Sequence, residues 1–212
     1  MFKWLSKYFA SPAELREAGI LGMNSRNFKF IAKQNKRRLY PLVDDKVQTK
    51  ALALQYGINT PRLIGTINYQ HEVDRLPLLV KDWPSFVIKP AHGSGGKGVL
   101  VIKSHDGETF VTPSGRSLTY KEIYQHISNT LSGLYSLGGQ YDTAVIEEMV
   151  NFSHIFDSYS YQGIPDVRII VYKGYPVMAM TRLATAASGG RANLHQGAVG
   201  VGLDIKTGKT LK

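Results

Sequence analysis

The sequence contains no cysteine, which excludes disulfides and thiolate metal sites and is compatible with a reducing compartment. It also lacks a signal-peptide pattern and any apolar run long enough to span a bilayer. Of its 212 residues, 43% are hydrophobic and 20% are charged, which is typical of a folded protein with a sizeable core. We therefore expect a cytoplasmic protein of one or two domains.

Acidic residues are missing from the stretch between Ala18 and Val43, although the stretch holds six basic residues: Arg26, Lys29, Lys33, Lys36, Arg37 and Arg38. The whole chain carries a net charge of +10. A run of this kind is commonly a solvated helix face, and the alternative is attraction to nucleic acid or an anionic membrane. Because no zinc-finger, RRM or KH signature is present, a nucleic-acid partner is disfavoured.

A glycine-rich loop, His92–Gly98, lies between two short apolar runs, Phe86–Pro90 and Val99–Ile102. Both runs are rich in β-branched residues and predict strands. Glycines let successive backbone N–H groups turn toward one point, which suits a phosphate, and Lys89 could place its ammonium beside the same anion. The alternative is an ordinary hairpin with a solvated tip.

The loop matches G-x-G-x-x-G through Gly93, Gly95 and Gly98. A dinucleotide-binding fold requires a helix after this motif, whereas a strand is expected here. A Walker loop requires Ser or Thr after its lysine, and Lys97 is followed by Gly98. The H-R-D and D-F-G elements of protein kinases are absent. A strand–loop–strand clamp over a nucleotide remains.

Capping signals predict helices after Ser11 and Thr119, and Asp45 is the expected N-cap of a helix over residues 46–55. The helix after Thr119 should turn Ile123, Ile127, Leu131 and Leu134 inward. We expect a short helix over residues 1–9 and another through the basic stretch, broken at Tyr40–Val43. Strands are expected at residues 63–66, 144–146, 167–172 and 177–183, with a turn at Lys173-Gly174 and a polar connection over residues 71–83.

Several motifs follow one another in a characteristic order: Asp45-Lys46, Lys89 with the glycine loop, Glu147-Glu148-Met149-Val150, Asp166-Val167-Arg168 and Arg191-Ala192-Asn193-Leu194-His195-Gln196-Gly197. This series resembles the ATP-grasp ligases, and within them the alpha-L-glutamate ligases. Residues 24–46 look like a related group associated with sugar-transfer loci. The resemblance covers about residues 24–205. It implies an α/β ATP-grasp fold with three parts: a basic helical extension (1–43), a first subdomain (44–145) and part of a second (146–212).

The resemblance also implies roles for individual residues. Lys46 and Lys89 would contact ATP, with Lys89 at the α- and β-phosphates, and the loop at Ser94, Gly95 and Gly96 would close over the β/γ end. Glu147 and Glu148 would lie at the hinge between the subdomains, where Glu148, Met149 and Val150 would contact adenine. Asp166 would contact the nucleotide, and the transferred phosphate would lie near three side chains: Arg168, Arg191 and Asn193.

In such a ligase, ATP phosphorylates a carboxylate and an amine attacks the acyl phosphate, so cations and hydrogen-bond donors are needed rather than a Ser or Cys nucleophile. The expected partners are ATP, a carboxylate donor and an amine acceptor, which would be an amino acid, a peptide or a sugar-linked group. The simpler alternatives are an exposed strand end for Glu147 and Glu148, and a surface ion pair for Asp166 and Arg168.

The magnesium ligands are the one departure from the pattern. The family resemblance implies a late acidic residue followed by a Glu-x-Asn element, whereas only Asp204 follows Gly197, in a segment typical of a hairpin turn. We therefore expect the Mg²⁺ ligands in a segment absent from this chain, and an ATP-grasp fold that is incomplete at its C-terminus. The alternative function is a nucleotide-binding module without catalytic turnover.

Overall fold

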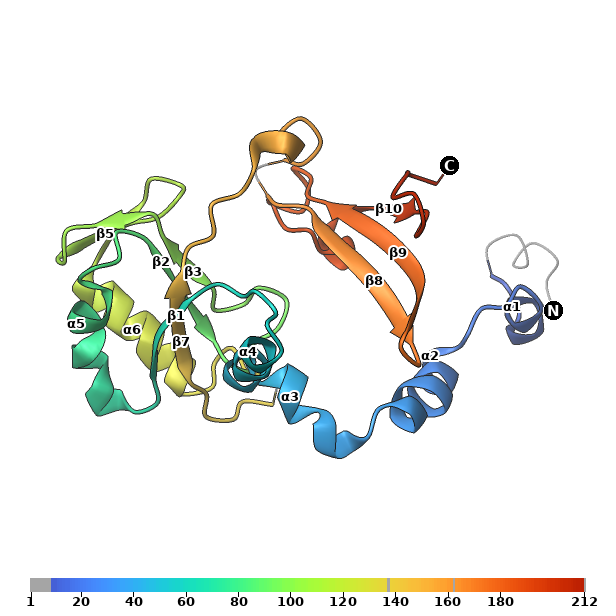
Figure 1. Cartoon of the computed structure of the whole chain (residues 1–212), viewed down its shortest axis with the longest axis horizontal. Coiled ribbons are helices and arrows are strands. Elements are labelled where there is room, and N and C mark those ends of the chain that lie inside the picture. Colours follow the sequence, from blue (N-terminus) through green and yellow to red (C-terminus); the bar gives the residue numbers. More distant parts are fainter. Residues whose placement is uncertain (1–8, 137, 162, 212) are drawn as a thin grey trace. The chain divides into compact units, whose positions relative to one another are not determined.

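The computed structural model describes residues 9–136, 138–161 and 163–211. The chain divides into two compact units, residues 1–44 and 45–212 (Figure 1). The short helix expected over residues 1–9 lies almost wholly outside the described part of the chain. Among the described residues, no helix combines the length and apolar character needed to cross a membrane. The further division expected at residue 146 stays a prediction.

The smaller unit consists of short helical elements: α1 (Pro12–Glu17), α2 (Met23–Ser25), the π-helical segment η2 (Arg26–Ala32), the 3₁₀ turn η3 (Arg37–Leu39) and α3 (Pro41–Asp44). Ser11 forms the predicted capping box with Glu14. The expected break at Tyr40–Val43 is wrong, because Pro41 begins α3; proline is tolerated in a first turn, where its missing N–H would have no partner. None of these elements contains a buried residue.

The larger unit contains a four-stranded antiparallel sheet in the order β1 (Leu63–Ile67), β7 (Ala144–Glu148), β2 (Phe86–Pro90) and β3 (Leu100–Ile102). The predicted strands on both sides of the glycine loop are confirmed, and the loop joins an antiparallel pair. Strand β7 lies between β1 and β2, so it fixes the position of the strand that carries Lys89.

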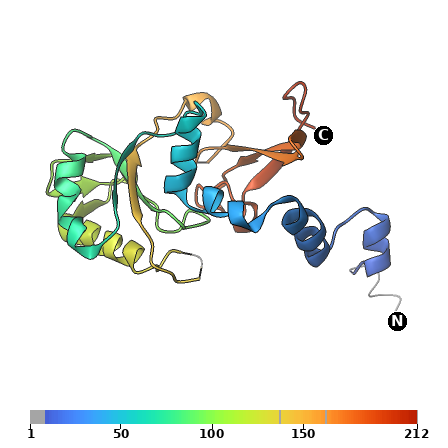
Figure 2. The ribbon, with the colours of Figure 1, turned by 60° about the horizontal axis from the view of Figure 1, so that its bottom comes forward.

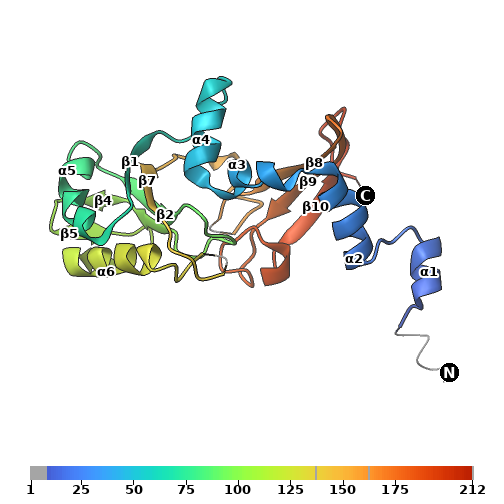
Figure 3. The same cartoon turned by 90° about the horizontal axis from the view of Figure 1, so that it is seen from below.

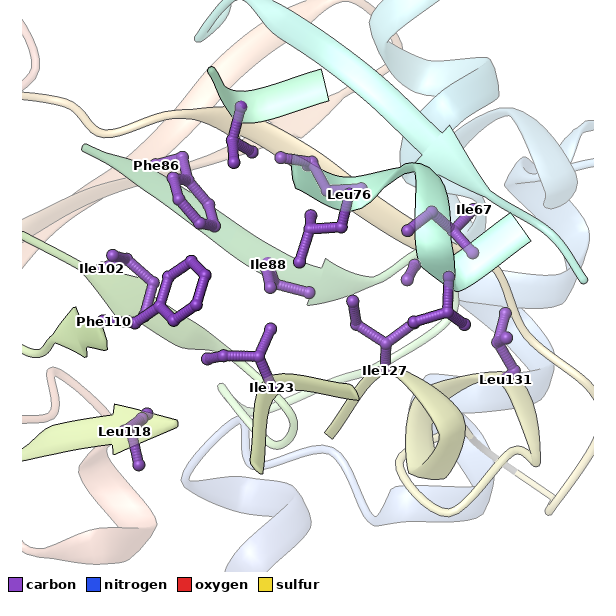
Figure 4. Close-up of a cluster of buried hydrophobic side chains, with 14 residues drawn as sticks. Ile67, Leu76, Phe86, Ile88, Ile102, Phe110, Leu118, Ile123, Ile127 and Leu131 are labelled. Carbon is purple, nitrogen blue, oxygen red and sulfur yellow. The ribbon is translucent and has the colours of Figure 1, made fainter. Parts of the chain in front are cut away.

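One face of this sheet packs on helices. Burial alternates along β2, so that Phe86 and Ile88 point into a core together with Ile146 of β7. The core is completed by η4 (Gln70–Arg75), α5 (Leu76–Val80) and α6 (Tyr120–Leu131), which lie along the same face (Figures 2 and 4). Lys89 follows Ile88 on β2, so its side chain lies on the other face of the sheet and points away from this core.

Helix α6 begins at the predicted capping box of Thr119 and Glu122 and buries Ile123, Ile127 and Leu131. Leu134, which was expected inward, is 65% exposed, because the helix ends at Leu131 and Gly133 takes a left-handed φ of 83°. Residues 71–83 are not merely a polar connection, since they contain most of η4 and all of α5.

Two smaller sheets complete the unit. The first has the order β4 (Ser104–His105), β5 (Thr109–Val111) and β6 (Ser117–Thr119). The second has the order β10 (Val199–Leu203), β9 (Tyr175–Leu183) and β8 (Asp166–Tyr172), with β8 and β9 forming a long hairpin (Figure 3). Lys173 and Gly174, with φ of 50° and 85°, form its two-residue turn, as predicted. This mixture of helices and sheets confirms the predicted α/β fold class.

Candidate functional site

The glycine loop leaves part of its backbone uncovered. Gly95 and Gly96 have φ of 64° and 75°, and no atom lies within 4 Å of where their Cβ would be. At Gly98, by contrast, there is no space for a side chain, because a Cβ would come within 2.5 Å of the ring of Tyr135. Glycine is therefore needed at Gly98 for packing, while Gly95 and Gly96 give an anion free approach to the main chain.

Lys46 holds the start of this loop. It is the first residue of α4 (Lys46–Gln55), whose N-cap is Asp45 as predicted. Its Nζ donates to the carbonyl oxygens of Ala91 (2.9 Å) and Gly93 (2.7 Å). Burial, and then the nearby charge of Lys89, lower the pKa of Lys46 below its usual 10.5. Its ammonium is thus partly desolvated and lies at the base of the loop, where an anion would relieve the repulsion from Lys89.

A buried carboxylate fixes His92, the first residue of the loop. Both oxygens of Asp142 lie 3.1 Å from the backbone N of His92, and Oδ1 lies 2.8 Å from its ring Nδ1. The side chain of Asp142 is fully buried. Sequence reasoning missed Asp142, because it precedes β7 and meets the loop only when β7 pairs with β2.

Glu147 joins two lysines beneath the loop. In the sheet register Val87 lies opposite Glu147, so Lys89, two residues further along β2, projects from the same face and forms an ion pair with Glu147. Lys50 of α4 lies 3.1 Å from the other carboxylate oxygen, and its side chain, like that of Glu147, is only 6% exposed. One carboxylate thus serves two ammonium groups, and the charges of Asp142 and Asp45 act on the nearby Lys46.

This position excludes the simpler reading of Glu147 as an exposed strand end. Its side chain is committed to Lys50 and Lys89, so it orients Lys89. Glu148 is half-buried, and its backbone N donates to the carbonyl oxygen of Arg62 (2.9 Å). The nucleotide contacts expected of both residues stay predictions.

Met149 and Val150 lie directly after β7 and line an open cavity of about 960 Å³. The other lining residues include Val101 and Lys103 on one side, and Ile164 and Gly190 on another. Cavities of 300–1,000 Å³ are typical of small-molecule sites. The lining combines apolar side chains with polar and charged ones, among them Lys103, His154 and Asp157. The adenine contacts expected at Met149 and Val150 stay predictions.

Asp166 lies on β8 and pairs across the hairpin with Arg182 of β9, rather than along its own strand with Arg168. Hydrogen bonding from Arg182 is the main cause that holds the pKa of Asp166 below its usual 3.8. Sequence reasoning missed Arg182. If the hairpin continued regularly from its two-residue turn, Thr181 would lie opposite Asp166. An irregularity between Ile170 and Val171 shifts the register by one residue, so Arg182 lies opposite Asp166 instead.

The three side chains expected near the transferred phosphate lie on elements other than that of Lys89. Arg168 is exposed on β8, and Arg191 is exposed in the loop before η6 (Leu194–Gln196). Asn193 is the N-cap residue of η6, and its side-chain amide donates to Gln196 Oε1 (3.3 Å). Convergence of these side chains on one phosphate stays a prediction.

Magnesium ligands are not assembled by the described residues, which contain no group of three or more His, Asp or Glu side chains able to hold a metal ion. Asp204 accepts hydrogen bonds from the backbone N (2.8 Å) and Oγ1 (2.7 Å) of Thr207, which makes it the turn-forming residue predicted from the sequence. We therefore assign no magnesium ligand.

Comparison with known proteins identifies the family of the chain. The family described as sugar-transfer associated ATP-grasp matches residues 25–212 and confirms the resemblance to ATP-grasp proteins, while the closer resemblance to alpha-L-glutamate ligases stays a prediction. No curated protein sequence matches the chain. ATP-grasp folds bind ATP, and the family generally carries ligase activity. The chain thus belongs to the sugar-transfer associated ATP-grasp family.

Proposed function

We propose that this protein is an ATP-dependent carboxylate–amine ligase that resembles alpha-L-glutamate ligases and works through an acyl phosphate. The observation that carries the proposal is the placement of two ammonium groups, those of Lys46 and Lys89, beside the glycine loop. Lys50 and Lys89 share the single carboxylate of Glu147, and Lys46 lies nearby with its pKa lowered by burial and by Lys89. A triphosphate would accept hydrogen bonds from these ammonium groups and from the uncovered main chain at Gly95 and Gly96.

In the proposed reaction a carboxylate oxygen of the donor attacks the γ-phosphorus of ATP, and the bond to the β-phosphate oxygen breaks to release ADP. An amine nitrogen then attacks the acyl carbon, the bond to phosphate breaks, and the amine loses a proton. Lys46 and Lys89 would hold the phosphates while the loop covers them. Arg168, Arg191 and Asn193 would bind the phosphoryl group in transit, and Met149 and Val150 would pack on adenine.

The proposed substrates follow from the same chemistry. The donor carries a free carboxylate, and glutamate is the first candidate because of the alpha-L-glutamate ligase resemblance. The acceptor is a primary amine on an amino acid, a peptide or a sugar-linked molecule. The absence of a protein nucleophile from this scheme means that both reacting groups belong to substrates.

The experiment is a screen of carboxylate and amine pairs that follows ADP and phosphate. We expect both products in equal amounts, only when donor and acceptor are present together. Replacing the amine by hydroxylamine should yield a hydroxamate, the product of a trapped acyl phosphate. Lys89→Met should abolish product, whereas Lys81→Met, at an exposed position of the same charge, should not. Release of AMP and pyrophosphate would contradict the acyl phosphate, and ATP binding without products throughout the screen would favour a nucleotide-binding module.

A further inference from the structure

Residues 20–39, here called the basic helical segment, combine two surface properties that the ATP chemistry does not use. The first is charge. All six cations of the segment are exposed, and no acidic residue lies between residues 18 and 43. Residues 23–34 are continuously helical, and Lys29 and Lys33 lie four residues apart on one side of the helix.

The second property is exposed apolar surface. Met23 is 72% exposed and Phe28 is 79% exposed, and five further large apolar residues of the segment are also exposed: Ile20, Leu21, Phe30, Ile31 and Leu39. None of the helical elements of this unit buries a residue. Large apolar side chains that gather exposed in one short segment point to a surface that meets a partner.

Charge decides between the possible partners. The net charge of the chain, +10, exceeds the six positive charges of the segment, so the rest of the molecule is also basic. A second copy of the chain would present the same sign of charge. The partner must therefore be anionic. Nucleic acid would satisfy the cations and could stack on the two phenylalanines, but it offers no apolar phase for Ile20, Leu21, Met23 and Ile31.

An anionic bilayer satisfies both properties at once. Helices that lie in the membrane interface direct Lys and Arg side chains toward lipid phosphates. They insert Phe, Leu and similar apolar side chains between the acyl chains. We propose that the basic helical segment docks this protein on the surface of an anionic lipid bilayer. Met23 and Phe28 enter the apolar layer, and Arg26, Lys29 and Lys33 contact headgroup phosphates.

The test is partitioning of the full chain onto vesicles of phosphatidylcholine, with and without phosphatidylglycerol, measured by cosedimentation. We expect binding only with phosphatidylglycerol, weakened by added salt. Arg26→Gln/Lys29→Gln/Lys33→Gln should reduce the partition constant by about a hundredfold, because each basic residue near such a surface contributes to binding. Its control, Lys81→Gln/Lys121→Gln/Lys209→Gln, removes the same charge from exposed positions elsewhere and should bind nearly as well as wild type.

A second pair of variants separates insertion from simple attraction of charge. Met23→Ser/Phe28→Ser should weaken partitioning at least tenfold, whereas Leu78→Ser/Leu134→Ser, at comparably exposed positions, should not. Because these four side chains are exposed, the variants should fold, and circular dichroism checks that they do. Equal binding by each variant and its control would overturn the proposal. So would tighter binding to random-sequence duplex DNA than to vesicles, which would assign the segment to nucleic acid.

Discussion

Glu147 is the buried acid on which two lysines depend. Its carboxylate pairs with Lys89 and lies 3.1 Å from Lys50, whose side chain is as inaccessible as its own. Lys50 also donates to the carbonyl oxygen of Pro61. A buried charge that loses its partner is costly, whereas the intact pair contributes little net stability. Glu147 therefore matters chiefly because its removal leaves an uncompensated cation.

We predict that Glu147→Gln lowers the free energy of unfolding by about 3–5 kcal/mol, the usual cost of breaking a buried ion pair from one side. The measurement is denaturant unfolding followed by circular dichroism. Glu148→Gln is the matched control, because Glu148 is the adjacent carboxylate on the same strand and is only half-buried. Equal destabilisation by the two substitutions would show that the ion pairs of Glu147 do not set its contribution.

Lys89 is predicted to bind phosphate. Lys89→Ala should weaken ATP binding by about 1.5–3 kcal/mol, the contribution typical of a hydrogen bond to a charged group, which is roughly a tenfold to hundredfold loss of affinity. Calorimetric titration with ATP measures it. The exposed Lys81→Ala serves as the control. Unchanged affinity in Lys89→Ala would remove this residue from the site.

His126 links the end of the glycine loop to helix α6, since its Nε2 lies 3.0 Å from the carbonyl oxygen of Gly98. Burial lowers its pKa below the usual 6.5, although the hydrogen bond to Gly98 opposes this shift. A histidine with a depressed pKa binds protons more readily in the unfolded state, so its contribution to stability is present above pH 6.5 and is lost as the pH falls through the folded value.

We therefore predict that wild type loses more stability than His126→Gln between pH 7.5 and pH 5, both chosen to bracket the ordinary pKa of about 6.5. The free energy of unfolding at each pH is the quantity to compare. His71→Gln, at an exposed position, should follow wild type. A pH dependence that survives in His126→Gln would place its origin in other groups.

At the scale of elements, helix-capping and turn residues correctly predicted where helices begin and where a hairpin turns, because these features depend on residues close in sequence. Asp45 and Thr119 identified the starts of α4 and α6, and Lys173-Gly174 identified the turn between β8 and β9. Helices α3 and α5 were missed because each contains a proline near its start, at Pro41 and Pro77. In a sequence, proline suggests that a helix is interrupted, yet proline is well accommodated in the first turn of a helix.

The candidate site could be predicted only in part. Lys89 and the glycines were identifiable, because strand, loop and lysine are contiguous. Asp142 was not identifiable, because it reaches His92 only through the pairing of β7 with β2. Glu147 was identified as a site residue, but its pairing with Lys50 and Lys89 was not predicted. Arg182 was missed for a related reason, since a shift in strand register decides its partner.

The glycine loop should become ordered when nucleotide binds. Glycine backbone has high conformational entropy, and contacts with phosphate would be needed to offset it. We predict slower hydrogen exchange over residues 92–98 with a non-hydrolysable ATP analogue than without it. Residues 107–115, which contain β5 and a glycine on each side of it, are an internal control that should not change. Equal exchange of the loop in both states would contradict a clamping role.

At the scale of the whole molecule, stability resides in the larger unit, because the described residues of the buried core all lie within residues 45–212. A ligand that binds the native state of this unit should raise its melting temperature. At a concentration of 100 times Kd, ATP should add about 2.7 kcal/mol. Thermal unfolding with and without ATP measures this gain, which should shrink in Lys89→Ala at the same ATP concentration. No shift in wild type would argue against ATP as the ligand.

The place of β7 in the sheet has a consequence for how the chain folds during synthesis. β7 lies between β1 and β2, yet it emerges from the ribosome after β1 to β6 and α6. Until Glu148 is free of the exit tunnel, β1 and β2 have open edges, and Lys50 and Lys89 lack their shared carboxylate. Such long-range pairing is slow, and the waiting edges are prone to aggregate. The nascent chain is therefore most vulnerable just before β7 arrives, and a chaperone that shields these edges would have its greatest effect then.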